Sequence, residues 1–250
     1  MKSIKLGLLG VLLMVAQVAQ AGEVRVAVAA NFPAPMQEIA PLFEQASGHK
    51  VSLSFGSTGK FYAQIKQGAP YDVLVSADSK TPQKLDGDGL TVPGSRFVYV
   101  LGKLVLWSAQ PGMVDDKGAV LRKGGYNKLA IGDPKLAVYG TAAQETLEEL
   151  GLWKPVQGKL VRGENITQTY QFAASGNAEL GFIALSQITK GGKVSEGSWW
   201  IVPKHYYSPI EQSAVMLSSA KDAAAAQAFL AFLKGSQAAT VIRSYGYELP

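Results

Sequence analysis

The loop from Gly56 to Lys60, with the sequence Gly-Ser-Thr-Gly-Lys, has the residue types in this chain best suited to chemistry. It lies between an apolar run at 51–55, which predicts a strand, and a helical pattern at 61–67. Free backbone N–H groups, two hydroxyls and the positive end of a helix would meet there, which suits an oxyanion. The loop therefore predicts anion binding, and the simpler alternative is an ordinary capped turn between strand and helix.

The same loop differs from a phosphate-binding P-loop at two positions. That motif requires Ser or Thr directly after Gly-Lys, where this chain has Phe61, and an earlier Gly, where this chain has Ser54. These differences exclude a nucleoside triphosphatase.

The first 21 residues predict export. Lys2 and Lys5 give a positive start, residues 6–16 form a short apolar stretch, and residues 19–21 (Ala-Gln-Ala) form a small-x-small cleavage pattern. We therefore expect a signal peptide over 1–21, cleaved near Ala21–Gly22, and a protein of the periplasm. No cysteine is present for a lipid anchor, and no later stretch is long and apolar enough to span a bilayer.

Composition narrows the possible functions further. Because the chain has no cysteine, disulfides, Cys-bound zinc and thiol nucleophiles are excluded, and the two histidines are too few for a His-based metal cluster. The net charge of +5 is spread along the chain rather than clustered, so nucleic acid is not expected as a partner.

Short apolar runs alternate with helical patterns, which predicts an α/β fold with ligands at the carboxyl ends of its strands. Two long runs with strand character, 97–107 and 207–217, are expected to be strands that cross between two lobes. The predicted domains are lobe 1 at 22–102, lobe 2 at 103–206, and a return strand with closing helices of lobe 1 at 207–250. The other expected strands are 24–30, 51–55, 72–76, 129–132, 159–161 and 180–185, and the expected helices are 33–46, 61–67, 81–86, 141–150, 166–174, 222–233 and 236–245.

A series of segments, in order along the chain, resembles the periplasmic molybdate-binding proteins, which are the substrate-binding components of molybdate ABC importers. The likeness covers nearly the whole chain after the predicted signal peptide. It implies the two-lobed clamshell of type II periplasmic binding proteins, with a doubly wound sheet in each lobe. The similar segments are 28–32, 54–60, 62–65, 68–73, 76–78, 102–108, 132–134, 173–176, 180–182, 233–239 and 245–247.

This resemblance also implies a site and a function. In that family a dehydrated tetrahedral oxyanion lies between the lobes, held by hydroxyls and backbone N–H groups, with no protein ligand to the molybdenum. The resemblance implies binding of molybdate and tungstate, no cofactor, no enzymatic activity, a membrane permease as partner and a monomeric protein. The positions that match the family's donors are Ala30, Asn31, Ser57 and Thr58 in lobe 1, and Tyr139 and Ile166, through their backbone N–H groups, in lobe 2.

The chain departs from one branch of the family at Ala184, where that branch has a tyrosine in the site. Either another donor replaces this tyrosine or the site has one hydrogen bond fewer. Asn31 is the expected replacement, because its side-chain amide has two N–H donors.

The residue types are also compatible with other ligands. Related clamshells bind sulfate, phosphate or ferric iron, and the sequence His205-Tyr206-Tyr207 has the residue types of an iron site, although the tyrosines also suit a strand between the lobes. Trp199 and Trp200 could stack on a flat ligand, but their apolar strand pattern favours a place in the core for both.

An exported phosphate-ester hydrolase is the enzymatic alternative. It would need a nucleophile with a neighbouring base or a metal site, and the chain has no G-x-S-x-G motif. Asp72, Asp78 and Asp133 are expected to cap helices and turns rather than to form a catalytic pair.

Overall fold

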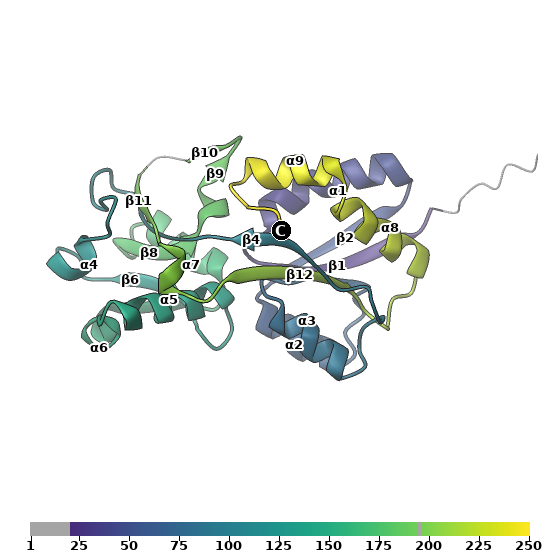
Figure 1. The fold of residues 1–250 in the computed structure, drawn as a ribbon, viewed down its shortest axis with the longest axis horizontal. Helices are drawn as coiled ribbons and strands as arrows, with labels where there is room; N and C mark the ends of the chain where they lie inside the picture. The colour runs from purple at the N-terminus through teal and green to yellow at the C-terminus, as the bar shows by residue number, and fades with distance from the viewer. Residues whose placement is uncertain (1–20, 195–196) are drawn as a thin grey trace, which may run out of the picture.

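The structure, a computed structural model, describes residues 21–194 and 197–250, so nearly all of the predicted signal peptide lies outside the described residues. Two five-stranded sheets lie side by side along the long axis of the molecule, each covered by helices (Figure 1). This arrangement confirms the predicted two-lobed α/β fold. Among the described residues, no helix combines the length and the apolar character needed to cross a bilayer.

The first lobe is a mixed sheet between two helical layers. Helices α1, α8 and α9 cover one face, and α2 and α3 cover the other (Figure 1). Its strands, in spatial order, are β2 (Lys50–Gly56), β1 (Glu23–Ala29), β3 (Val73–Val75), β12 (Ile210–Met216) and β4 (Phe97–Gly102). The helices are α1 (Pro33–Ser47), α2 (Thr58–Lys66), α3 (Lys80–Gly87), α8 (Ala223–Leu233) and α9 (Ser236–Ser244).

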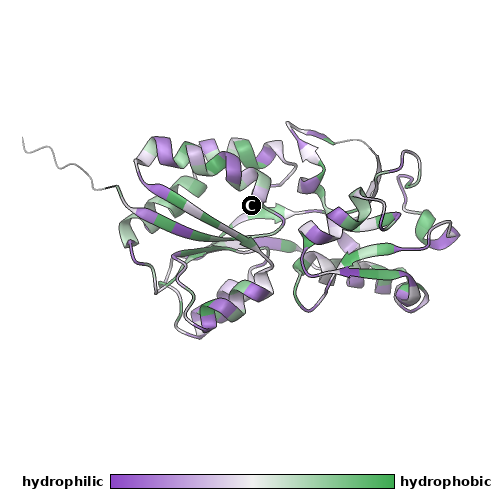
Figure 2. Cartoon of the chain, turned by 180° about the vertical axis from the view of Figure 1, so that it is seen from behind, coloured by the Kyte–Doolittle hydropathy of each residue, from purple (hydrophilic) through white to green (hydrophobic). Residues whose placement is uncertain are grey.

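Alternation along β1 explains why this sheet is covered on both faces. Val24, Val26 and Val28 contribute to one apolar cluster with α1, α8 and α9, whereas Ala27 packs with α2 and α3 on the other side. In Figure 2 the helices carry hydrophilic and hydrophobic residues along the same length, as expected when one face meets the sheet and the other meets water.

The second lobe repeats the design. Helix α5 packs on one face of its sheet, and α7 packs on the other. Its strands, in spatial order, are β11 (Ser198–Ile201), β5 (Leu104–Ser108), β8 (Leu180–Ala184), β6 (Leu129–Gly132) and β7 (Leu160–Gly163). The helices are α4 (Val120–Lys123), α5 (Val138–Glu149), α6 (Trp153–Val156) and α7 (Ile166–Ala174). Two short strands, β9 (Thr189–Lys190) and β10 (Lys193–Val194), form a small hairpin.

The chain passes between the lobes twice. The run at 97–107, predicted as one strand, is two strands in different sheets: β4 ends at Gly102 and β5 begins at Leu104, with Lys103 between them. The return passage leads into β12, which begins at Ile210 rather than at the predicted 207. Strands from distant parts of the sequence therefore meet in the first sheet, where β12 pairs antiparallel with both β3 and β4.

Two further details of the sequence prediction are wrong. Helices α2 and α5 each begin three residues before the predicted start, at Thr58 and Val138, which places their first turns beside the gap between the lobes. The core position expected for both tryptophans holds only for Trp200: Trp199 is 36% exposed, because β11 is an edge strand whose residues alternate between buried and exposed positions.

Candidate functional site

The six residues predicted for the site all line one small cavity between the lobes. No residue in its wall is charged. Ala29, Ala77, Ala137, Val138 and Asn165 complete the wall, and none of these five was predicted. The predicted six are Ala30, Asn31, Ser57, Thr58, Tyr139 and Ile166.

Three helices begin at this cavity. Thr58 is the first residue of α2, Tyr139 is the second of α5, and Ile166 is the first of α7. The first four N–H groups of a helix have no partner within the helix, and the aligned peptide dipoles leave a partial positive charge at that end. An uncharged cavity at three such ends is electropositive without any cationic side chain, which suits a bare anion.

Local capping explains why two of these helices begin where they do. The Ser57 hydroxyl accepts a hydrogen bond from the Lys60 N–H at 3.4 Å, and the Asn165 side-chain Oδ1 accepts from the Gln168 N–H at 3.0 Å. Both are side-chain caps at the N-cap position. The start of α5 has no side-chain cap, because its N-cap residue is Ala137.

The Thr58 hydroxyl is placed to serve a ligand. It is 4% exposed, and its oxygen accepts a hydrogen bond from the Ala77 N–H at 3.1 Å. Since this bond uses the oxygen as an acceptor, the hydroxyl hydrogen remains to be donated. Thr58 is therefore both a brace between two loops of the first lobe and a potential donor to the cavity.

Asn31 differs from the sequence prediction. Its side-chain Nδ2 already donates to Gln212 Oε1 and to Tyr247 Oη, each at 2.8 Å, so the expectation of two N–H donors facing an anion is wrong for this conformation. Its Oδ1 is the one buried side-chain polar atom, among the described residues, without a hydrogen-bond partner. Ala184, the position where the family tyrosine is missing, lies at the end of β8, and its N–H donates to Gln187.

A buried polar network lies behind the cavity, and the sequence does not predict it. Gln212 is fully buried in β12 and donates to the Tyr139 hydroxyl at 3.0 Å, while its Oε1 accepts from Asn31 and from Tyr99. Burial raises the pKa of the phenols of Tyr99, Tyr139 and Tyr247, so these groups stay neutral at physiological pH. A glutamine in the strand predicted at 207–217 is the signal in the sequence, because an amide that becomes buried requires partners.

Direct contacts hold the two lobes together around the cavity. At the rim, Lys60 and Glu164 form an ion pair of 2.5 Å between half-exposed side chains. Further contacts between lobes are Thr167 Oγ1 to the Ala30 carbonyl at 2.7 Å, Ser186 Oγ to the Asn31 carbonyl at 3.0 Å, and the Gly59 N–H to the Leu136 carbonyl at 3.4 Å. The structure therefore shows a closed arrangement of the lobes.

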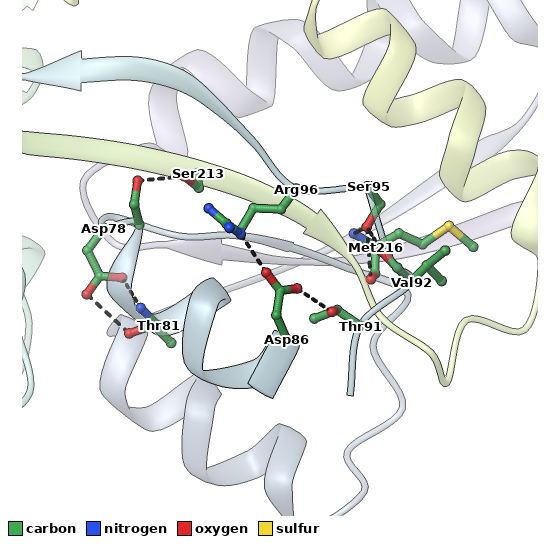
Figure 3. A network of polar contacts seen from close by, with 10 residues as sticks. Asp78, Thr81, Asp86, Thr91, Val92, Ser95, Arg96, Ser213 and Met216 are labelled. Atoms are coloured by element: carbon green, nitrogen blue, oxygen red, sulfur yellow. Dashed lines mark hydrogen bonds and ion pairs between the residues drawn. The ribbon is translucent and has the colours of Figure 1, made fainter. Parts of the chain in front are cut away.

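The aspartates considered for catalysis have structural partners. Asp78 accepts from the Thr81 N–H at 2.8 Å at the start of α3 (Figure 3), and Asp133 accepts from the Lys135 N–H at 2.9 Å within a turn. Asp72 is fully buried and forms an ion pair with Arg25 at 2.6 Å. The prediction of capping and turn roles is confirmed for Asp78 and Asp133.

The residues considered for iron lie outside the cavity wall. His205 packs against Tyr206, with ring centroids 4.2 Å apart, and the Tyr207 hydroxyl accepts from the Leu104 N–H at 3.2 Å. Over the part of the chain that the structure describes, no three His, Cys, Asp or Glu side chains form a group that could hold a metal ion.

The two lobes and the electropositive cavity between them define a solute-binding protein of the clamshell class. Residues 24–248 match the model of the family described as bacterial extracellular solute-binding protein. The chain is 56% identical over 236 residues to the molybdate-binding protein ModA of Azotobacter vinelandii, covering 94% of each sequence. It is 52% identical to the molybdate-binding protein ModA of Rhodobacter capsulatus, covering 92% of this chain and 89% of the relative.

A solved structure agrees with these sequence comparisons. The periplasmic molybdate-binding protein of Azotobacter vinelandii superposes with a TM-score of 0.89 at 44% identity, covering 91% of this chain and 99% of that one. The chain therefore belongs to the bacterial extracellular solute-binding proteins and, within them, to the family of the molybdate-binding proteins.

Proposed function

We propose that this protein captures molybdate, and tungstate, in the cavity between its lobes and delivers the oxyanion to the membrane permease of an ABC importer. The observation that carries this proposal is the meeting of three helix N-termini in a cavity without charged side chains. The names of the relatives supply the identity of the oxyanion.

The donors we propose are the residues at those helix starts and the first-strand loop. Backbone N–H groups of Tyr139 and Ile166 act from the second lobe, and the hydroxyls of Ser57 and Thr58 act from the first, with the loop at 30–31 beside them. A hydrogen bond to a charged group contributes about 1.5–3 kcal/mol. About six such bonds offset the loss of freedom on association and leave micromolar or tighter affinity.

Selectivity in this proposal comes from the size of the cavity. A smaller oxyanion such as sulfate cannot reach donors on both walls at once, and each buried donor left without a partner costs about 1–3 kcal/mol. Molybdate and tungstate are nearly equal in size and should both satisfy the full set.

Closure of the lobes is the step that couples binding to delivery. Only the closed arrangement brings donors of both lobes to one oxyanion, so the ligand favours that state by its differential affinity. The proposed hinge lies at the two passages between the lobes, near Lys103 and at 207–209, which agrees with lobe 1 at 22–102 and 207–250 and lobe 2 at 103–206. The permease would then recognise the closed form.

The setting of this function is also proposed. We place the protein in the periplasm after removal of residues 1–21, as a monomer that binds its oxyanion without a cofactor, without a protein ligand to the metal and without catalysis. Its sequence relatives are named as binding proteins, which supports this assignment.

Isothermal titration calorimetry of ligand-free mature protein tests the proposal. Molybdate and tungstate should each give one-to-one binding heats, while sulfate, phosphate and ferric citrate give none at the same concentrations. Binding of sulfate, phosphate or ferric citrate without molybdate would reassign the ligand, and turnover of a chromogenic phosphate ester that disappears in Thr58→Ala would support the hydrolase instead.

A further inference from the structure

We infer that Gln212 is a positioning residue that sets which edge of the Asn31 amide faces the cavity, and that the two amides reverse together when the oxyanion enters. This inference rests on the proposed function, because it describes how the same site changes from its unliganded to its liganded state.

The starting observation is a mismatch at Asn31. Both of its N–H bonds are used by Gln212 and Tyr247, which lie outside the cavity wall, whereas its Oδ1 is buried and has no partner. A bare carbonyl oxygen on a residue that lines an anion site would repel the anion, and leaving it unpaired has a cost of its own. The orientation seen here therefore does not suit an oxyanion complex.

Gln212 is the residue that holds this orientation. It is fully buried in β12, at the point where the pairing with β4 shifts register. Its Oε1 accepts from Asn31 Nδ2 at 2.8 Å and from the Tyr99 hydroxyl at 3.1 Å, and its Nε2 donates to the Tyr139 hydroxyl at 3.0 Å. One amide on the return strand thus contacts a cavity residue of each lobe.

A half turn of both amides preserves the network, because the remaining partners are phenols that can either donate or accept. After the turn, Gln212 Nε2 donates to Asn31 Oδ1 and to the Tyr99 oxygen, and Gln212 Oε1 accepts from the Tyr139 hydroxyl. The Tyr247 hydrogen, now donated to the Asn31 backbone carbonyl at 2.7 Å, turns to Asn31 Oδ1.

Other bonds keep the surroundings satisfied during this change. The Asn31 backbone carbonyl still accepts from Ser186 at 3.0 Å, and the Tyr99 hydroxyl donates to the Ser76 carbonyl, 3.3 Å away. The group left without a protein partner is then the Asn31 N–H edge in place of Oδ1, and the oxyanion supplies its acceptor. No proton is transferred and no covalent bond changes.

A second glutamine near the site provides an internal control. Gln187 accepts from the Ala184 N–H at 3.0 Å and donates to the Ile166 carbonyl at 3.0 Å. Both partners are backbone groups with fixed polarity, so this amide cannot reverse, although it lies directly behind a proposed ligand contact.

Nuclear magnetic resonance of the full mature protein, labelled with ¹⁵N in the side chains of Asn and Gln, tests the reversal. On titration with molybdate, the side-chain amide signals of Asn31 and Gln212 should both move to new positions, and Gln187 should move much less. Molybdate binding in which Gln212 moves no more than Gln187 would overturn the inference and leave the proposed function intact. A protein that binds neither molybdate nor tungstate would remove both.

Affinity measurements supply an independent test. In Gln212→Glu the carboxylate can only accept, so it holds the Asn31 N–H groups away from the cavity, and the Kd for molybdate should rise roughly 10- to 150-fold, as for the loss of one charge-assisted bond. Gln64→Glu adds the same charge at an exposed position on α2 and should leave the Kd unchanged.

A double variant separates positioning from simple repulsion by the new charge. If Gln212 acts through Asn31, then Gln212→Glu in an Asn31→Ala background should change the Kd by less than about 3-fold, because coupled residues are not additive. A full 10- to 150-fold effect in that background would mean repulsion and would overturn the inference.

Discussion

Replacing Thr58 by valine is the sharpest test of an individual donor. Valine keeps the β-branched shape of threonine in the first turn of α2 and removes only the hydroxyl. That hydroxyl accepts from the Ala77 N–H at 3.1 Å and, in the proposed complex, donates its hydrogen to the oxyanion. The substitution therefore has two separable effects, one on ligand binding and one on the stability of the ligand-free protein.

The size of both effects follows from the burial of the site. Thr58 is 4% exposed and Ala77 is 6% exposed, so water cannot replace the lost bonds. Loss of one charge-assisted bond corresponds to about 1.5–3 kcal/mol, or a Kd for molybdate roughly 10- to 150-fold higher. The unpaired Ala77 N–H should lower the free energy of unfolding by about 1–3 kcal/mol even without ligand.

Titration calorimetry gives the first effect, and thermal unfolding of the ligand-free protein gives the second. Thr58→Ser retains the hydroxyl and should recover most of both. Thr240→Val, which removes an exposed hydroxyl bonded within α9, is the matched control and should change neither quantity. If Thr58→Val bound molybdate with the affinity of the unaltered protein, the assignment of this hydroxyl to the oxyanion would be refuted.

Three further predictions concern backbone packing and pH. In Gly140→Ala the new methyl would lie 2.2 Å from the backbone carbonyl at the end of β6, so α5 must shift, and molybdate binding should weaken at least about 10-fold in calorimetry although no ligand contact is removed. In Gly59→Ala the methyl would lie 3.2–3.3 Å from the backbone of Leu136 in the other lobe, so the closed contact must give by a few tenths of an ångström and calorimetry should show weaker molybdate binding, whereas an unchanged Kd would contradict the closed contact. Burial raises the pKa of Asp72, but hydrogen bonds from Arg25 outweigh burial and leave the pKa of this carboxyl below its usual value. The Asp72 carboxylate therefore stabilises the fold above pH ~4, and this stabilisation is lost as the pH falls through the lower pKa of the folded state. Asp72→Asn should lower the free energy of unfolding by about 3 kcal/mol at neutral pH, and thermal unfolding of the variant should show a smaller loss of stability in acid.

Local patterns in the sequence are sufficient to find the loop from Gly56 to Lys60 and its role as a helix start. Its strand, its capping Ser57 and its helix are neighbours in sequence, so propensity and capping rules apply directly. The start of α5 is harder to predict, because Ala137 offers no capping side chain, and the turn before the helix is closed only by backbone bonds from the Leu136 and Ala137 N–H groups to the Asp133 carbonyl.

The network behind the cavity depends on contacts that no local pattern contains. Asn31 and Gln212 are 181 positions apart, and Asn31 and Tyr247 are 216 apart. The residue types alone place Asn31 at the end of a strand with two free donors, whereas the fold uses those donors inside the protein. The exposed position of Trp199 has a similar origin, because the edge position of β11 depends on pairing with β5.

Anomalous diffraction at the molybdenum edge from crystals of the complex tests the central claim most directly. The account predicts one molybdenum peak in the cavity between Thr58, Tyr139 and Ile166, surrounded by four oxygens of its own and by no protein ligand. A peak elsewhere, or a protein atom bonded to the metal, would contradict the account.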